Sequence, residues 1–189
     1  MRRHFLLTAL AALVAVGCSD FNDLPDPTVT NIVVDSVSLS ALTGTPVAQP
    51  SAYSIPDNQA VRTDLTSGFD FAFDLDSTAD GIQPVLVPLA ALGLSTNSGV
   101  DPGLQRTDLA FDGITKAPGN GYTTDSALVV DSGTVLFARS RVVCGVLGVP
   151  QYAKLEVTGV DPAQRTLTFR ILSDNNCGYR GLEPGLPRE

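Results

Sequence analysis

The sequence predicts an all-β domain, either a single antiparallel β-sandwich or an irregular barrel, and three observations favour this class. The acidic side chains are 17 Asp and only three Glu, and lysine occurs twice; Asp favours turns, whereas Glu and Lys favour helices. The chain also has 17 Gly and 13 Pro, which interrupt helices and form turns. Finally, short stretches alternate apolar and polar residues with the period of two that is typical of half-buried strands.

The first 17 residues are expected to be a signal peptide rather than part of the domain. Arg2 and Arg3 give a positive start, and Phe5–Val16 form an apolar run whose only polar member is Thr8. This run is too short for a helix that spans a bilayer, which needs about 20 apolar residues. Its length is that of the apolar segment of a signal peptide.

The stretch Ala15-Val16-Gly17-Cys18 resembles the lipobox read by lipoprotein signal peptidase, with Ala15 where leucine is usual. We therefore expect cleavage before Cys18 and a lipid on this cysteine that anchors the protein in a bacterial cell envelope. Ser19 follows the cysteine, which favours the outer membrane in bacteria that sort lipoproteins. The alternative is cleavage by ordinary signal peptidase, which would release a soluble protein that begins with a free cysteine.

Residues 18–30 are expected to form the lipidated end and a flexible tether, followed by one domain over residues 31–189. After Cys18 the chain reads SDFNDLPDPTVT, a polar segment interrupted by Pro25 and Pro27. Such a composition is typical of linkers.

The clearest strand pattern is Phe69–Asp76, which reads FDFAFDLD. Its odd-numbered residues are large and apolar and its even-numbered residues are Asp or Ala, so we expect one buried and one solvated face. Further strands are expected at Ile32–Ser40, Thr134–Val143, Tyr152–Val157 and Thr166–Leu172, separated by Asp-Gly and Asp-Pro turn signals.

Two prolines modify this series of strands. Pro84 and Pro88 are expected to keep Val85–Val87 out of a central strand, because proline cannot donate to a ladder of hydrogen bonds. A single helical turn is expected near Leu89–Leu92.

Composition and motifs argue against several function classes. Without residues 1–17 the chain has 10 basic and 20 acidic side chains, which argues against nucleic acid as a partner. The only histidine, His4, leaves with the signal peptide, so a Ser-His-Asp or Cys-His arrangement cannot form. No GxSxG, HExxH or phosphate-loop motif is present. We expect no enzymatic activity; an Asp-based enzyme would need two carboxylates that converge in a pocket.

Cysteines and aspartates give two further candidate sites. Cys144 and Cys177 form an even pair once Cys18 is lipidated, which predicts a disulfide in an oxidising compartment. The alternative, a two-thiolate metal site, lacks a nearby His or a CxxC motif. Oxygen ligands suited to calcium occur at Asp74, Asp76 and Asp80, but this loop departs from the EF-hand pattern, and the favoured interpretation is an acidic turn after a strand.

Four motifs, taken in order, resemble the HmuY-like family of secreted or lipid-anchored β-rich proteins that capture haem. Gly68–Phe73 resembles the aromatic-Asp-x-Ala-Phe strand of the family, with Phe69 where tryptophan is usual. Thr96–Gly99 resembles the Thr-Asn-x-Gly turn that follows, and Phe111–Asp125 resembles the middle stretch that contains Ala-Pro. Tyr152–Val157 resembles the Tyr-Ala-Lys strand.

The resemblance implies a β-sandwich-like fold and the binding of haem or another porphyrin. Family members hold the haem iron with His or Met, and both Met1 and His4 leave with the signal peptide. Tyrosine can also be an axial ligand, and Tyr122 and Tyr179 lie beside glycines in expected loops. The favoured interpretation of each tyrosine on its own is a surface or packing residue.

Two arginines could pair with a carboxylate of such a ligand. Arg139 and Arg141 are two residues apart on one expected strand face, and arginine pairs well with a haem propionate. The alternative is an exposed strand face balanced by Asp.

Two functions remain open from the sequence. The first is a cell-envelope lipoprotein whose β domain captures a small ligand, with haem or another porphyrin as the ligand that the resemblance implies. The second is a non-haem β module that contacts proteins of the envelope and is stiffened by the disulfide. An apolar cleft with an arginine at its mouth would favour the first function, and its absence the second.

Overall fold

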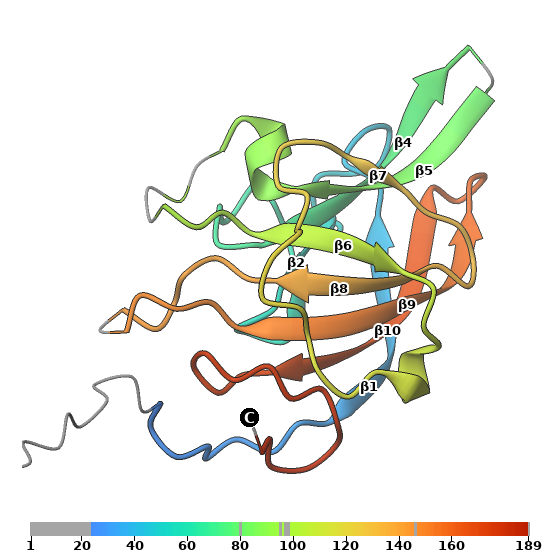
Figure 1. Cartoon of the computed structure of the whole chain (residues 1–189). Coiled ribbons are helices and arrows are strands. Elements are labelled where there is room, and N and C mark those ends of the chain that lie inside the picture. Colours follow the sequence, from blue (N-terminus) through green and yellow to red (C-terminus); the bar gives the residue numbers. More distant parts are fainter. Residues whose placement is uncertain (1–23, 80, 95, 97–98, 146, 189) are drawn as a thin grey trace, which may run out of the picture.

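The computed structural model describes residues 24–79, 81–94, 96, 99–145 and 147–188, and it confirms an all-β domain of the sandwich type. Two antiparallel sheets of five strands pack face to face (Figure 1). In the part of the chain that is described, no helix is long and apolar enough to cross a membrane. The expected signal peptide and Cys18 lie outside the described residues.

The first sheet contains strands expected at residues 32–40, 134–143, 152–157 and 166–172, together with one strand, Gly103–Thr107, for which the sequence gives no expectation. Its order is β1 (Val33–Ser40), β10 (Thr166–Asp174), β9 (Tyr152–Asp161), β8 (Val135–Arg139) and β6 (Gly103–Thr107). The turn between β9 and β10 confirms an expected Asp-Pro signal, because the Asp161 carboxylate accepts hydrogen bonds from the N–H groups of Ala163 and Gln164, both at 2.9 Å.

The second sheet lies against the first. Its order is β3 (Gln59–Val61), β2 (Ala52–Ser54), β4 (Phe71–Thr78), β5 (Gly81–Pro88) and β7 (Leu128–Val129). Two short 3-10 helices complete the described elements, η1 (Leu89–Leu92), which is the expected helical turn, and η2 (Phe111–Gly113).

The expectation that Pro84 and Pro88 exclude Val85–Val87 from a strand inside the sheet is wrong. β5 runs through both prolines and pairs with β4 along its whole length, and β7 covers its other edge at two residues. The carbonyl of Pro84 accepts a hydrogen bond from the N–H of Val130, on the β7 side. The edge at which proline lacks a donor therefore points away from β4, so the ladder between β4 and β5 loses nothing.

Aromatic side chains from both sheets form the centre of the core. The Tyr53 ring lies 5.7 Å from the Phe71 ring, within its own sheet, and 5.4 Å from the Phe169 ring of the facing sheet. Tyr53 is fully buried, and its hydroxyl donates to Oδ1 of Asn58 at 2.7 Å. A buried phenol needs such a partner, because an unpaired hydroxyl would be costly.

The start of the FDFAFDLD stretch departs from the expected alternation. Phe71, Phe73 and Leu75 face the central core as predicted, but Phe69 packs in a separate cluster with Ala72. Asp70 and Ala72, both expected on a solvated face, are only 1% and 0% exposed. Asp70 precedes β4, which begins at Phe71, so the period of two does not apply to it. Ala72 lies within β4 but is covered by the cluster that contains Phe69 and Leu89.

The structure also differs from the expected flexible tether at residues 24–30. The N–H groups of Thr28 and Val29 donate to Oδ1 of Asn176, both at 2.9 Å. Next along the chain, Asn31 forms an isolated antiparallel bridge with Gly185. This part of the polar segment docks because its backbone groups find partners on the chain that follows β10.

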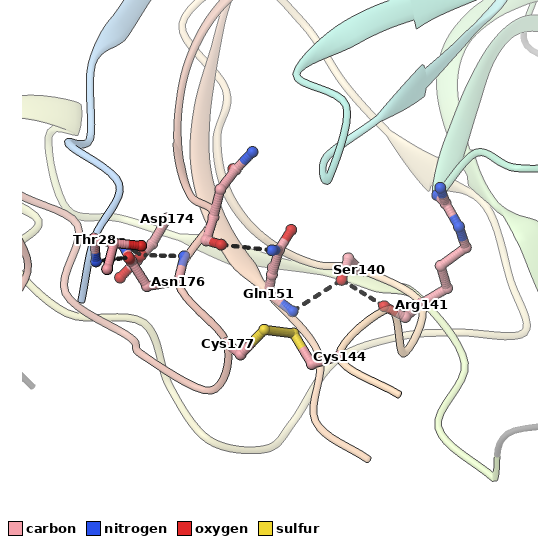
Figure 2. The surroundings of a disulfide bond; sticks show 9 residues. Thr28, Ser140, Arg141, Cys144, Gln151, Asp174, Asn176 and Cys177 are labelled. Carbon is pink, nitrogen blue, oxygen red and sulfur yellow. Dashed lines mark hydrogen bonds between the residues drawn. A yellow bond between two sulfur atoms is a disulfide. The ribbon is translucent and has the colours of Figure 1, made fainter. Parts of the chain in front are cut away.

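The expected disulfide is present between Cys144 and Cys177, whose Cα atoms are 5.8 Å apart. It joins the loop between β8 and β9 to the segment that follows β10 (Figure 2).

Replacing both Cys144 and Cys177 with serine should lower the free energy of unfolding by roughly 3–4 kcal/mol, because the bond closes a long loop in the unfolded chain. Urea unfolding followed by circular dichroism measures this. Reduced wild-type protein is the matched control and should resemble the double variant. Equal stability of the double variant and the oxidised wild type would contradict the prediction.

Candidate functional site

Several strands meet at one end of the sandwich, which we call the disulfide end. The register places Arg139, the last residue of β8, opposite Tyr152, the first residue of β9, and Tyr152 opposite Asp174 at the end of β10. The disulfide between Cys144 and Cys177 links the two segments that leave the first sheet at this end (Figure 2).

A cleft of about 380 Å³ opens at the disulfide end. It is lined by Ser67, Gly68, Leu89, Leu94, Thr96, Arg141 and Val142. Its volume lies within the range of small-molecule sites, roughly 300–1,000 Å³. Leucine side chains from η1 and the segment after it supply apolar surface, and Arg141 is the charged residue of the cleft.

Two larger hollows are weaker candidates for a ligand site. One, of about 520 Å³, follows residues 181–188, and the other, of about 500 Å³, lies between residues 106–110 and 132–135. Polar groups line most of both, whereas small-molecule sites are predominantly apolar with a few placed polar groups. The cleft beside Arg141 is therefore the better candidate despite its smaller size.

A buried carboxylate holds Arg141 in place. Oδ1 of Asp70 accepts hydrogen bonds from the backbone N–H of Arg141 at 2.7 Å and from its Nη1 at 3.2 Å. Oδ2 of Asp70 accepts from the N–H of Ile55 at 2.7 Å. Asp70 thus joins the chain after β2 to the chain after β8, which belong to different sheets, and charge-assisted hydrogen bonds of this kind are among the stronger ones.

A second acidic group reaches Arg141 from the loop between β2 and β3. Nη2 of Arg141 lies 3.2 Å from Oγ of Ser54 and 3.5 Å from Oδ2 of Asp57. Two carboxylates, those of Asp57 and Asp70, therefore converge on one guanidinium. Neither lines the cleft, so their arrangement fits the positioning of Arg141.

The expected pairing of Arg139 with Arg141 on one strand face does not form. β8 ends at Arg139, so Arg141 lies beyond the strand. Nη2 of Arg139 donates to the carbonyl of Asp101 at 2.9 Å, and its guanidinium lies 4.9 Å from the centre of the Tyr122 ring. The two arginines thus have separate sets of partners.

The two candidate tyrosines do not lie at the cleft. The hydroxyl of Tyr122 donates to the carbonyl of Pro118 at 2.9 Å, and burial raises the pKa of this phenol well above its usual value. Tyr179 is partly buried, and its N–H donates to the carbonyl of Asn176. Neither tyrosine is among the residues that line the cleft with Arg141. The described residues therefore do not place an iron ligand for haem beside Arg141.

The calcium candidate receives no support from the described residues. They contain no group of three or more His, Cys, Asp or Glu that could hold a metal ion. Oδ1 of Asp74 instead accepts hydrogen bonds from the N–H and the hydroxyl of Thr43, at 3.1 and 2.8 Å. Asp80 lies outside the described residues, so this site stays a prediction.

Sequence reasoning missed Asp70 and the cleft itself. The alternation of residues 69–76 predicts a solvated face for Asp70, and its partner Arg141 is 71 residues away along the chain. The cleft is lined by residues from three parts of the chain, at positions 67–68, at positions 89, 94 and 96, and at positions 141–142, which only the fold brings together. No local pattern in the sequence predicts that these residues line one cleft.

Comparisons with known proteins do not assign the chain to a family. No family model, no curated protein and no solved structure matches the chain.

The buried carboxylate of Asp70 predicts a dependence of stability on pH. Burial raises the pKa of Asp70 to about 6, against the opposing effects of the Arg141 charge and of the hydrogen bonds that the carboxylate accepts. Because an unfolded Asp releases its proton near pH 4, the stabilisation linked to this proton is complete below about pH 4 and is lost as the pH rises through about 6.

Urea unfolding of the wild type and the Asp70→Asn variant at a series of pH values tests this. The stability of the wild type relative to the variant should fall by about 2–3 kcal/mol between those two pH values. Asp57→Asn is the matched control, because it removes the more exposed carboxylate on Arg141 and should keep the wild-type dependence. Parallel curves for the wild type and Asp70→Asn would contradict the prediction.

Proposed function

We propose that this chain is a lipid-anchored protein of the bacterial cell envelope that captures a small apolar ligand bearing a carboxylate. The observation that carries the proposal is the cleft at the disulfide end, where the exposed Leu94 supplies apolar surface beside Arg141 and the buried Leu89 also lines the cleft. An apolar site with a few placed polar groups is the usual form of a small-molecule site.

The charges around Arg141 define how such a ligand is held. The hydrogen bonds of its side chain to Asp70, Ser54 and Asp57 use three of the five N–H donors of a guanidinium. Donors therefore remain for a carboxylate of the ligand. Because Asp57 and Asp70 offset the positive charge, apolar contact supplies most of the affinity and the carboxylate sets the orientation.

Porphyrins such as haem belong to this ligand class, and the resemblance to the HmuY-like family supports them as candidates. They are planar, mainly apolar small molecules that carry propionate groups. Since neither Tyr122 nor Tyr179 lines the cleft, recognition in it depends on the porphyrin surface and its carboxylates rather than on iron.

The features of the N-terminus support the location. A short apolar run precedes a lipobox-like sequence that ends at Cys18. The bond between Cys144 and Cys177 fits an oxidising compartment such as the periplasm or the cell surface.

Mass spectrometry of the N-terminal peptide tests the anchor. In a bacterial host the mature chain should begin at an acylated Cys18 and fractionate with membranes, and Cys18→Ser should abolish the acylated peptide. Ser19→Ala is the matched control and should remain acylated. A soluble chain that begins with an unmodified Cys18 would show instead that ordinary signal peptidase cleaves it.

Titration with haemin and with metal-free protoporphyrin tests the ligand class. Both should bind saturably and with similar affinity, as followed by the Soret band. Leu94→Glu should weaken binding at least about tenfold, because it places a charge against an apolar ligand. Ile82→Glu, in the hairpin of β4 and β5, changes another exposed apolar residue and should bind like the wild type.

The pattern of results separates the alternatives. Binding of haemin alone would indicate iron ligation and overturn recognition through the cleft surface. The absence of saturable binding by either porphyrin would exclude this ligand and favour a β module for protein contacts.

A further inference from the structure

The docked part of the N-terminal segment begins at the disulfide end. A Cβ atom added to Gly178 would lie only 2.8 Å from Cδ2 of Leu24 and 3.3 Å from Cγ2 of Val149. Gly178 also has a φ of +78°, where a side chain would be strained. Leu24 therefore packs closely against the segment that follows Cys177, beside the loop between β8 and β9.

Asn176 binds the N-terminal segment through hydrogen bonds to its backbone. Its Oδ1 accepts from the N–H groups of Thr28 and Val29, and its Nδ2 donates to the carbonyl of Val29 and to Oδ1 of Asp174, both at 2.8 Å. Cys177, the next residue, is tied to Cys144 (Figure 2). The start of the domain is thus attached to its disulfide end through several hydrogen bonds.

The length of chain before Leu24 limits how far this end can be from the membrane. Six residues lead from Cys18 to Leu24, and extended chain spans at most about 3.6 Å per residue, or roughly 22 Å here. β9 alone has 10 residues, so the opposite end of the sandwich is about 30 Å further along the strands. A lipid on Cys18 therefore places the disulfide end closest to the bilayer.

An exposed apolar loop lies at this same end. The stretch from Val142 to Pro150 contains no charged residue in a chain with 32 charged ones. Within it, Val143 and Leu147 are 38% and 44% exposed. The acidic balance of the whole chain repels anionic surfaces, so a contact with lipid here would depend on apolar side chains.

We propose that Val143 and Leu147 insert into the headgroup and acyl boundary of the membrane that holds the lipid anchor, so that the disulfide end faces the bilayer. This inference rests on the proposed anchoring at Cys18. Two side chains alone bind a bilayer weakly, but the anchor keeps them at a high local concentration next to the surface.

The chain has no tryptophan, so single tryptophans can report this contact. Leu147→Trp and Val143→Trp place the reporter in the loop, and Ile82→Trp places it in the hairpin of β4 and β5, at the opposite end. Full-length protein from a bacterial host is reconstituted into phosphatidylcholine vesicles with or without lipids brominated on their acyl chains, which quench tryptophan. Flotation of the vesicles measures the anchoring separately.

Emission from Leu147→Trp and Val143→Trp should shift to the blue and lose about half its intensity with brominated lipid, because apolar side chains at this boundary lie ~5–10 Å deep. Emission from Ile82→Trp should not change. Protein that floats but shows unquenched loop tryptophans overturns the membrane contact and leaves the anchoring intact. Protein that does not float overturns both proposals.

Discussion

The buried carboxylate of Asp70 joins the two sheets at the end where the cleft opens. Packing of Tyr53, Phe71 and Phe169 supplies the main driving force between the sheets, but hydrophobic contact is not directional. Asp70 adds a directional contact between the sheets, because its oxygens accept hydrogen bonds from the backbone N–H groups of Ile55 and Arg141. A buried carboxylate that lost these partners would cost several kcal/mol, and the position of Arg141 depends on this constraint.

A chain of hydrogen bonds continues from Arg141 to the docked N-terminal segment. Oγ of Ser140 donates to the carbonyl of Arg141 and accepts from the N–H of Gln151, whose Nε2 donates to the carbonyl of Asn175 (Figure 2). Asn176, the next residue, holds the N-terminal segment. The cleft, the disulfide and the start of the domain therefore form one connected region.

Local patterns in the sequence predicted most of the first sheet, because β1, β8, β9 and β10 are rich in β-branched and apolar residues between clear turn signals. The disulfide followed from the number of cysteines. Errors arose where a neighbour in space decides the outcome: Asp70 is buried because Arg141 reaches it, and Pro84 is tolerated because its donor-free edge faces β7. The cleft depends on three distant segments and has no local signal.

The pairing of β1 with β10 has a consequence for the order of folding. The first sheet cannot form until β10, which ends at Asp174, is present, and Asn31 exchanges backbone hydrogen bonds with Gly185, still later in the chain, at 2.8 and 3.0 Å. A chain that crosses a membrane with its N-terminus first would receive its lipid long before that point. With the proposed lipid on Cys18, the protein would be fixed to the bilayer while still unfolded, and since strands this far apart in sequence pair slowly, it would have to stay free of aggregation at the surface until β10 has been translocated.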